Sequence, residues 1–403
     1  MAKRLYLLLF FLSGNICFSQ TIVEGQGDSL SQNIYYANRL SSHPFGILRS
    51  RFNHNFQTSP TEGISLSFQL SSGNVWLPEV LAYEPLEQQD RDLLSSLAWN
   101  DREFYFKESS MPANTMELHA DGVFRFYQID LLIPLREGHE LTLNTRAFSL
   151  DGGSVPASLL TSDQFIEWFH SNIAGGEDPF ARKVYGLNNA QVFYQDAREK
   201  VWEMNKGGFT LSGIDLSYSY YPEFKGLKRK GFYTRFGGQL GVNVSGANPS
   251  LDLGLNSTFV KTLEFANRKE LRIGLSASAF KLNVISLGEG VELSNRRLLL
   301  DSEFLLSYLI PIRQNAYFSL AVSYGIQSSY FRSSEFDYQV LTGDRISSHW
   351  HYSISHLYKT LSASSLIVSY SHGILAYSLF LREDFSVDNA PDVQVGLGLR
   401  LSF

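Results

Sequence analysis

The chain has 403 residues, a formal net charge of −6 and a single cysteine, Cys17. An acidic chain is a poor partner for nucleic acid, and one cysteine excludes an intramolecular disulfide. Beyond the amino terminus no apolar run approaches the roughly 20 residues that a membrane helix requires, so a helical membrane protein is excluded as well.

The amino terminus has the pattern of a secretory signal peptide. Lys3 and Arg4 precede an apolar run over residues 5–12, and small and polar residues follow. We expect residues 1–19 to be removed, which leaves a mature chain without cysteine, disulfide or thiolate metal site. Lipidation of Cys17 is disfavoured because a bulky residue comes directly before it.

Residues 20–60 are polar and weakly patterned. They predict an amino-terminal segment that lies in the periplasm or folds into a barrel as a plug, and a mobile leader is an equal alternative. Regular patterning starts only after this segment, so we expect residues 61–403 to form one domain.

From Ile64 onward, apolar and polar residues alternate with the period of two that gives a strand one apolar and one polar face. Alternating segments lie at 64–71, 127–133, 141–147, 214–220, 238–244, 251–259, 271–277, 304–310, 318–327, 350–354, 366–382 and 392–403. A change of parity within 366–382 indicates a bulge near Gly373. The pattern predicts an all-β fold, an antiparallel transmembrane β-barrel of about 12 strands with both ends on the periplasmic side.

The last strand supports this location. Its apolar face includes Leu399 and Leu401 and ends in Phe403. A final strand that ends in Phe resembles the carboxy-terminal signal of bacterial outer-membrane barrels. We therefore expect these three residues to engage the barrel-assembly machinery, and the protein to lie in the outer membrane of a Gram-negative bacterium, surrounded by its lipid. The abundance of aromatic residues, 14% of the chain, is typical of such barrels.

Two long segments are predicted to be extracellular loops. Residues 73–116 contain three prolines and an acidic centre, with a short helix expected near 93–99. Residues 151–207 contain a second helix, which Thr161 or Ser162 can cap and whose apolar side would be formed by Phe165, Ile166 and Phe169.

The polar faces of the predicted strands define the interior of the barrel. Polar residues inside a barrel of this size line a water-filled channel or pack into a polar plug. The candidate lumen residues are Asp130, Asn144, Arg146, Asp215, Asp252, Arg272, Gln327 and Arg400.

Candidate catalytic or metal-binding residues are few. His349 and His351 share one face of a predicted strand, but a third metal ligand is missing. His351 and Ser353 look like the catalytic pair of outer-membrane phospholipase A, but the Asn and Gly that should follow the Ser are absent, and the pair should face the lumen instead of the lipid. We assign no catalytic residue, metal or cofactor from the sequence.

The helix of the second loop places Asp163, Glu167 and His170 near one face. Carboxylates beside a histidine could transfer protons or bind a cation, whereas the simpler alternative is a solvated helix face.

This loop also carries a family resemblance. Its characteristic residues are Gly152, Gly153, Asp163, Ile166, Glu167, Phe169, His170 and Arg182. A Gly-rich entry followed by Asp-x-x-Ile-x-x-Phe-His resembles a family of uncharacterised outer-membrane β-barrels, known as a domain of unknown function. The chain departs from the family after the His, where residues 172–176 replace a longer charged run. The resemblance implies a barrel whose signature is this loop, and it implies no reaction.

Together these features predict a non-enzymatic outer-membrane barrel that passes or binds a small solute, with the long loops gating its outer mouth. Two alternatives are a plugged barrel used for surface binding or structure, and an outer-membrane lipid hydrolase.

Overall fold

The computed structural model describes residues 43–51, 54–153, 158, 160–174, 186–313, 315–343, 357–383 and 393–403. Its strands form one antiparallel sheet, and twelve of them close into a ring through the pairing of β1 with both β2 and β15. In ring order these are β1 (Ser65–Pro85), β2 (Ala113–Arg136), β3 (His139–Asp151), β6 (Phe209–Tyr220), β7 (Phe232–Asn243), β8 (Ser250–Glu264), β9 (Glu270–Ser286), β10 (Leu298–Arg313), β11 (Ala316–Gln327), β13 (Leu361–His372), β14 (Leu375–Glu383) and β15 (Val393–Ser402). The predicted twelve-stranded barrel is confirmed.

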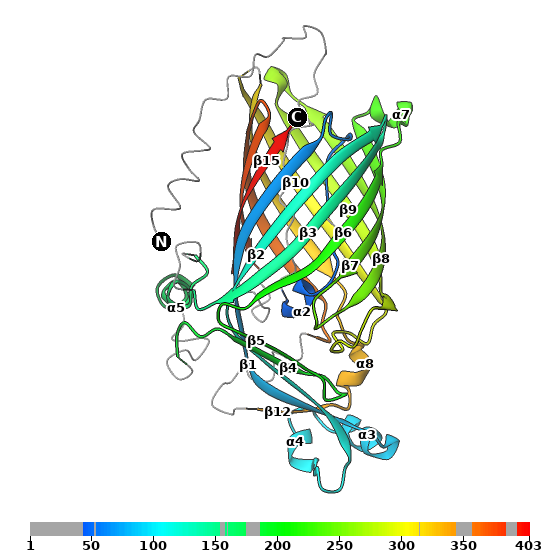
Figure 1. The fold of residues 1–403 in the computed structure, drawn as a ribbon, viewed down its shortest axis with the longest axis vertical. Helices are drawn as coiled ribbons and strands as arrows, with labels where there is room; N and C mark the ends of the chain where they lie inside the picture. The colour runs from blue at the N-terminus through cyan, green and yellow to red at the C-terminus, as the bar shows by residue number, and fades with distance from the viewer. Residues whose placement is uncertain are drawn as a thin grey trace. The chain divides into compact units, whose positions relative to one another are not determined.

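Short turns and long loops lie at opposite ends of the ring. Ser65 pairs with Ser402, so the first and last ring strands meet at the end that carries the short turns, which is uppermost in Figure 1. The long connections lie at the other end, as in outer-membrane barrels with short periplasmic turns and longer extracellular loops.

The wall is apolar outside because outward positions of each strand hold large apolar residues. Examples with more than a third of their surface exposed are Phe68, Leu70, Ile129, Leu216, Leu255, Phe259, Leu275, Leu320, Leu379 and Leu397. Inward positions are mostly buried and polar. An apolar outer wall around a polar interior is the arrangement of barrels in the outer membrane of Gram-negative bacteria, which confirms the predicted location. No helix within the described ranges is long and apolar enough to span a membrane.

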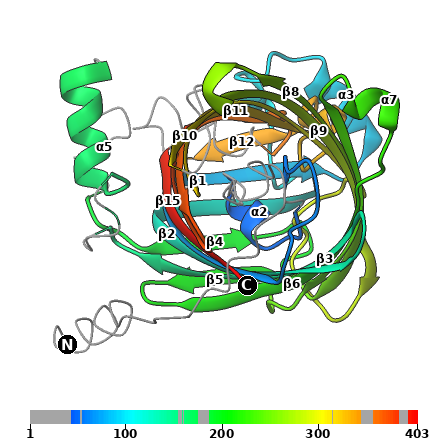
Figure 2. The ribbon, with the colours of Figure 1, turned by 90° about the horizontal axis from the view of Figure 1, so that it is seen from above.

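Residues 43–51 and 54–60, which we call the inner segment, lie inside the ring and begin with the short helix α2 (Pro44–Ile47), as Figure 2 shows from above. Backbone carbonyls of this segment accept hydrogen bonds from inward side chains of β3, β6 and β7. The barrel is therefore occupied along its interior by its own chain.

The extracellular end differs from the prediction in its first loop. β1 continues to Pro85 and β2 begins at Ala113, so a hairpin extends beyond the ring where a loop over 73–116 was predicted. The interval between them holds α3 (Gln88–Ser95) and α4 (Arg102–Tyr105). The prediction failed because the prolines and a register shift between Leu77 and Val80 interrupt the alternation without ending the strand.

Three short strands extend the same hairpin. β12 (Val340–Gly343) pairs with β1, while β4 (Gln191–Gln195) pairs with β2 and with β5 (Val201–Asn205). The second predicted loop thus contains a hairpin in addition to the predicted helix, α5 (Asp163–Phe169), which continues as a π-helical turn, His170–Ala174. Short helices α7 (Lys225–Lys228) and α8 (Ser333–Phe336) and a 3₁₀ turn, Ala266–Arg268, complete the described elements.

The predicted strand over 366–382 is wrong in one respect. β13 and β14 form a hairpin in which His372 pairs with Leu375, so only Gly373 and Ile374 lie between them. Gly373 has φ +58°, which suits the first central position of a type II′ turn. The parity change in the sequence marks this turn and not a bulge. The other strand predicted nearby, 350–354, lies outside the described residues.

Candidate functional site

Arg146 connects the wall to the inner segment. Its guanidinium is 2.7 Å from Asp215, and both side chains are almost completely buried. It also donates to the carbonyl of Arg49 and to Asn243, at 2.9 Å. Ser50, on the inner segment, donates to the same Asn243 at 3.2 Å. Two predicted lumen residues, Arg146 and Asp215, therefore meet at one point of contact with the segment.

The neighbouring strands continue this network. Asp252 accepts hydrogen bonds from Asn243 at 2.7 Å and from the backbone N–H of Asn283 at 2.8 Å. Arg272, which is fully buried, lies 2.9 Å from Glu270 on the same face of β9. These predicted lumen residues are held by other wall residues, and a role for them in solute selectivity stays a prediction.

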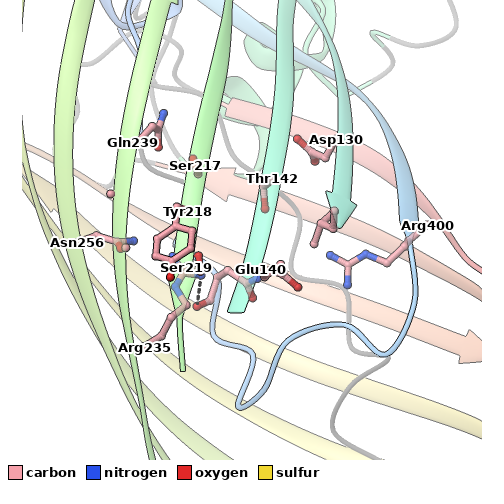
Figure 3. Close-up of a pocket in the computed structure, with 14 residues that line it drawn as sticks. Asp130, Glu140, Thr142, Ser217, Tyr218, Ser219, Arg235, Gln239, Asn256 and Arg400 are labelled. Carbon is pink, nitrogen blue, oxygen red and sulfur yellow. Dashed lines mark hydrogen bonds between the residues drawn. The ribbon is translucent and has the colours of Figure 1, made fainter. Parts of the chain in front are cut away.

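A polar pocket occupies the periplasmic half of the interior and has about 520 Å³ of empty volume, open solvent included. Figure 3 shows Asp130, Glu140, Arg235 and Arg400 around it. Asp130 accepts hydrogen bonds from Ser67 at 3.1 Å and from Asn144.

Glu140 faces the interior and binds Thr61, which lies just before the first strand of the wall. It accepts hydrogen bonds from the Thr61 backbone N–H at 2.9 Å and from the Thr61 hydroxyl at 3.1 Å. Glu140 was not among the predicted lumen residues, although its alternation with Leu141 and Leu143 could have indicated that it faces inward.

A second contact with the inner segment lies farther round the wall, on β9 and β10. His54 bonds Ser276 at 2.7 Å and also contacts Asp301, which lies 3.5 Å from Arg51. Gln327, the remaining predicted lumen residue, is half-buried beside a small hollow that Arg51 and Asp301 also line. The segment is thus bound at two separate parts of the ring.

The interior also has an apolar patch that the sequence did not predict. Phe56, 1% exposed, packs in a cluster whose wall members are Val260, Leu305, Leu309, Ala321, Ile367, Ala376 and Phe380. The sequence of β10 indicates this patch, because Leu305 and Leu309 place apolar residues on the inward face in addition to Phe304 and Leu306 on the outward face.

The extracellular mouth is covered by the β4–β5 hairpin and the loop between β9 and β10. Tyr194 donates to the carbonyl of Glu292 at 2.6 Å, and its ring lies 4.5 Å from Phe45 of the inner segment. Burial raises the pKa of Tyr194 well above its usual value, and the nearby charges of Asp196 and Glu292 raise it further. The hydroxyl therefore stays protonated as a donor.

Asp196, at the tip of this hairpin, fastens it to the loop. Its carboxylate accepts the backbone N–H of Glu292 and the Arg198 guanidinium, each at 2.7 Å. Burial alone would raise the pKa of Asp196, but these bonds and the backbone N–H of Lys200 outweigh it, so the pKa lies below its usual value. The hairpin thus runs from its pairing with β2 to the loop between β9 and β10, across the extracellular end of the ring.

Asp163 connects two parts of the signature loop, residues 151–207, to each other and to β1. This buried carboxylate accepts hydrogen bonds from Asn74 at 2.8 Å and from the backbone N–H of Asn188 at 2.7 Å. Gly152 allows the approach, because a Cβ there would lie 2.3 Å from the Asn188 carbonyl oxygen. Gly153, at φ +74°, is the other glycine of the signature.

The rest of the signature differs in part from the prediction. Ser162 caps α5 by accepting the Phe165 N–H at 3.2 Å. Only Ile166 of the predicted apolar side is buried, whereas Phe169 is 38% exposed. Asp163 is buried and not solvated. Glu167 is half-buried, while the His170 side chain and Arg182 lie outside what the structure describes.

Leu399 and Leu401 lie outward on β15, and Phe403 is 73% exposed, with its backbone N–H bonded to the Ile64 carbonyl at 2.8 Å. Engagement of these residues by assembly machinery stays a prediction. No group of three metal-ligating side chains occurs in the described ranges, and His349, His351 and Ser353 lie outside them.

No described protein family matches the chain, and no curated protein sequence matches it. Among solved structures, an outer membrane channel from Pseudomonas putida F1 is similar with 8% identity and a TM-score of 0.36, over 85% of this chain and 96% of that chain. LpxR from Salmonella typhimurium is similar with the same identity and TM-score, over 84% of this chain and 100% of that one. The beta domain of the Bordetella autotransporter BrkA gives 8% identity, a TM-score of 0.36, and coverage of 85% and 100%. Likenesses of this size carry no argument about activity.

Proposed function

We propose that the protein is a non-enzymatic outer-membrane channel for a small polar solute, closed at rest by the inner segment, which acts as a plug. The proposal rests on the contacts between this segment and the wall. Side chains of the wall donate to backbone carbonyls of the segment, as Arg146 does to Arg49 and Gln239 does to Arg51. Donors that bind a peptide backbone can bind water or a polar solute when the segment leaves.

Wall glycines make room for the plug. An added Cβ at Gly241 would lie 1.7 Å from the Ser50 hydroxyl, and one at Gly274 would lie 2.4 Å from the Phe56 ring. Gly325, at an inward position of β11, has no atom nearer than 3.9 Å to such a Cβ. Alanine at Gly241 or Gly274 should therefore displace the inner segment, whereas alanine at Gly325 should leave it in place.

Single-channel recording in planar bilayers tests the proposal. We expect few openings from the wild-type protein and from Gly325→Ala, more frequent openings from the double variant Gly241→Ala/Gly274→Ala, and a lasting conductance when residues 43–60 are deleted. If all of these proteins fold as barrels and stay silent, the channel proposal is wrong.

A plugged barrel for surface binding or structure is the second candidate, and the apolar cover of the mouth favours it. Phe45 packs against Tyr194 and Tyr330, and Phe331 lies 5.6 Å from Tyr358. Such a core is costly to open, since burial of each large side chain stabilises it by about 1.5–3 kcal/mol. Silence of the deletion variant would favour this candidate.

A further inference from the structure

We propose that α5 and its π-helical turn, residues 163–174, lie in the outer leaflet and bind membrane lipid at the boundary between headgroups and acyl chains. Helices that lie in this boundary have one apolar and one polar side and insert by about 5–10 Å. The inference concerns the outer surface of the barrel and does not depend on whether the interior conducts.

The base of the signature loop is attached to the outside of the wall. Phe68, Leu70, Ser72 and Asn74 follow one another at every second position of β1, and Phe68 and Leu70 are outward and 41% exposed, so all four share the outer side of the strand. Asn74 donates to the Thr161 carbonyl at 3.0 Å and to Asp163, and the Ser72 hydroxyl lies 2.9 Å from that of Thr161. Figures 1 and 2 agree that α5 lies outside the ring.

The attachment lies at the outer edge of the apolar wall. β15 has 10 residues, enough to cross the membrane when tilted, and Ser72 pairs with Val395 near its extracellular end. On the nearby strands β2 and β6, at about the same height, the rings of Tyr127 and Phe209 are 6.2 Å apart. Aromatic residues gather where hydrocarbon meets headgroups, so α5 begins at that level.

The helix presents apolar side chains away from the barrel. Ile166 is buried against the protein, whereas Trp168 is 52% and Ile173 60% exposed. The ring of Phe165 lies 6.0 Å from that of Trp168 and 6.2 Å from that of Phe169. This exposed cluster continues the lipid-facing wall at the depth of the interface, and lipid is therefore its natural partner.

One flank of the helix is polar. Gln164 and Ser171 are exposed, and Gln164 lies five positions before Phe169, about 140° around an α-helix, and four before Trp168, about 40° around it. Trp168 therefore lies at the border of the polar flank, and Phe169 and Ile173, which lie farther from it, are the apolar positions to compare with Gln164 and Ser171.

The test uses single cysteines in a Cys17→Ser background, which carries no other cysteine. Phe169→Cys and Ile173→Cys are labelled with an environment-sensitive fluorophore, with Gln164→Cys and Ser171→Cys as controls. In vesicles of brominated phospholipid we expect the first pair to lose emission, most strongly when the bromine is near the headgroup, and the second pair to lose little.

Equal quenching of both pairs, or quenching of neither, would overturn the proposal. A blue shift at Phe169→Cys and Ile173→Cys that depends on protein concentration and is insensitive to brominated lipid would instead assign the surface to a second copy of the chain. All four substituted residues are exposed, so heat-modifiable migration on gels should report a folded barrel in each case.

Discussion

Arg146 and Asp215 give the sharpest energetic prediction. Replacing Arg146 by Met leaves the Asp215 carboxylate buried without its partner, and removing one member of a buried ion pair costs about 3–5 kcal/mol. Arg146→Met/Asp215→Leu removes both charges. It should recover most of this loss and remain about 1–2 kcal/mol below wild type, because hydrogen bonds to Arg49 and Asn243 are still missing.

The assay is reversible urea unfolding in lipid vesicles, followed by tryptophan fluorescence. The matched control is Lys228→Met, which breaks an ion pair with Glu223 whose side chains are 53% and 56% exposed, and which should cost less than about 1 kcal/mol. If Arg146→Met costs no more than the control, or if the double variant is as unstable as the single one, the pair does not hold the interior together.

Three further predictions concern the turns and loops. Gly373→Ala places a Cβ at φ +58° and should lower the free energy of unfolding by about 1 kcal/mol in the same assay, whereas Gly226→Ala, at a helical position of α7 with open space around it, should not lower it. The lowered pKa of Asp196 means that its contribution is complete above the ordinary Asp pKa of about 3.9 and is lost as the pH falls through the lower folded value. The protection factors of the Val201–Asn205 amides, which correct for the intrinsic effect of pH on exchange, should therefore fall below about pH 4, and unchanged protection in acid would contradict this role. Asp163→Ala removes the acceptor of hydrogen bonds from Asn74 and the Asn188 N–H, and should expose residues 158–174 to protease while the barrel stays folded. Asp163→Asn should have a smaller effect. Equal cleavage of Asp163→Ala and wild type would contradict this prediction.

The sequence predicted the ring well because each membrane strand must present one face to lipid. Leu216, Phe259 and Leu320 are outward as their alternation requires, and a slip by one residue would bury polar side chains in hydrocarbon. The same rule weakens beyond the membrane. From Val75 to Pro85 both sides of β1 contact protein, the alternation is lost, and the strand could not be distinguished from a loop.

The inner segment could not be placed from sequence for a different reason. Much of its binding uses backbone carbonyls, as at Leu48 and Asn55, and carbonyls are the same in every residue. The pattern of the segment therefore holds little information about its partners. The more informative signal lies in the wall, where Gly241 and Gly274 occupy inward positions that a side chain would close.

The two walls of the interior hold the inner segment by different forces. On one wall Arg146, Gln239 and Arg235 donate to its backbone, whereas the other wall adds an apolar patch around Phe56 to the polar contacts of His54 and Arg51 with Asp301. Water can replace the hydrogen bonds at a net cost of about 0.5–1.5 kcal/mol each, but exposing the Phe56 ring costs about 1.5–3 kcal/mol with nothing to replace the contact. Opening along the polar wall is therefore the less costly movement. The pocket lined by Asp130, Arg235 and Arg400 lies on that wall, so solute entering from the periplasmic side would meet the segment where it is most easily displaced.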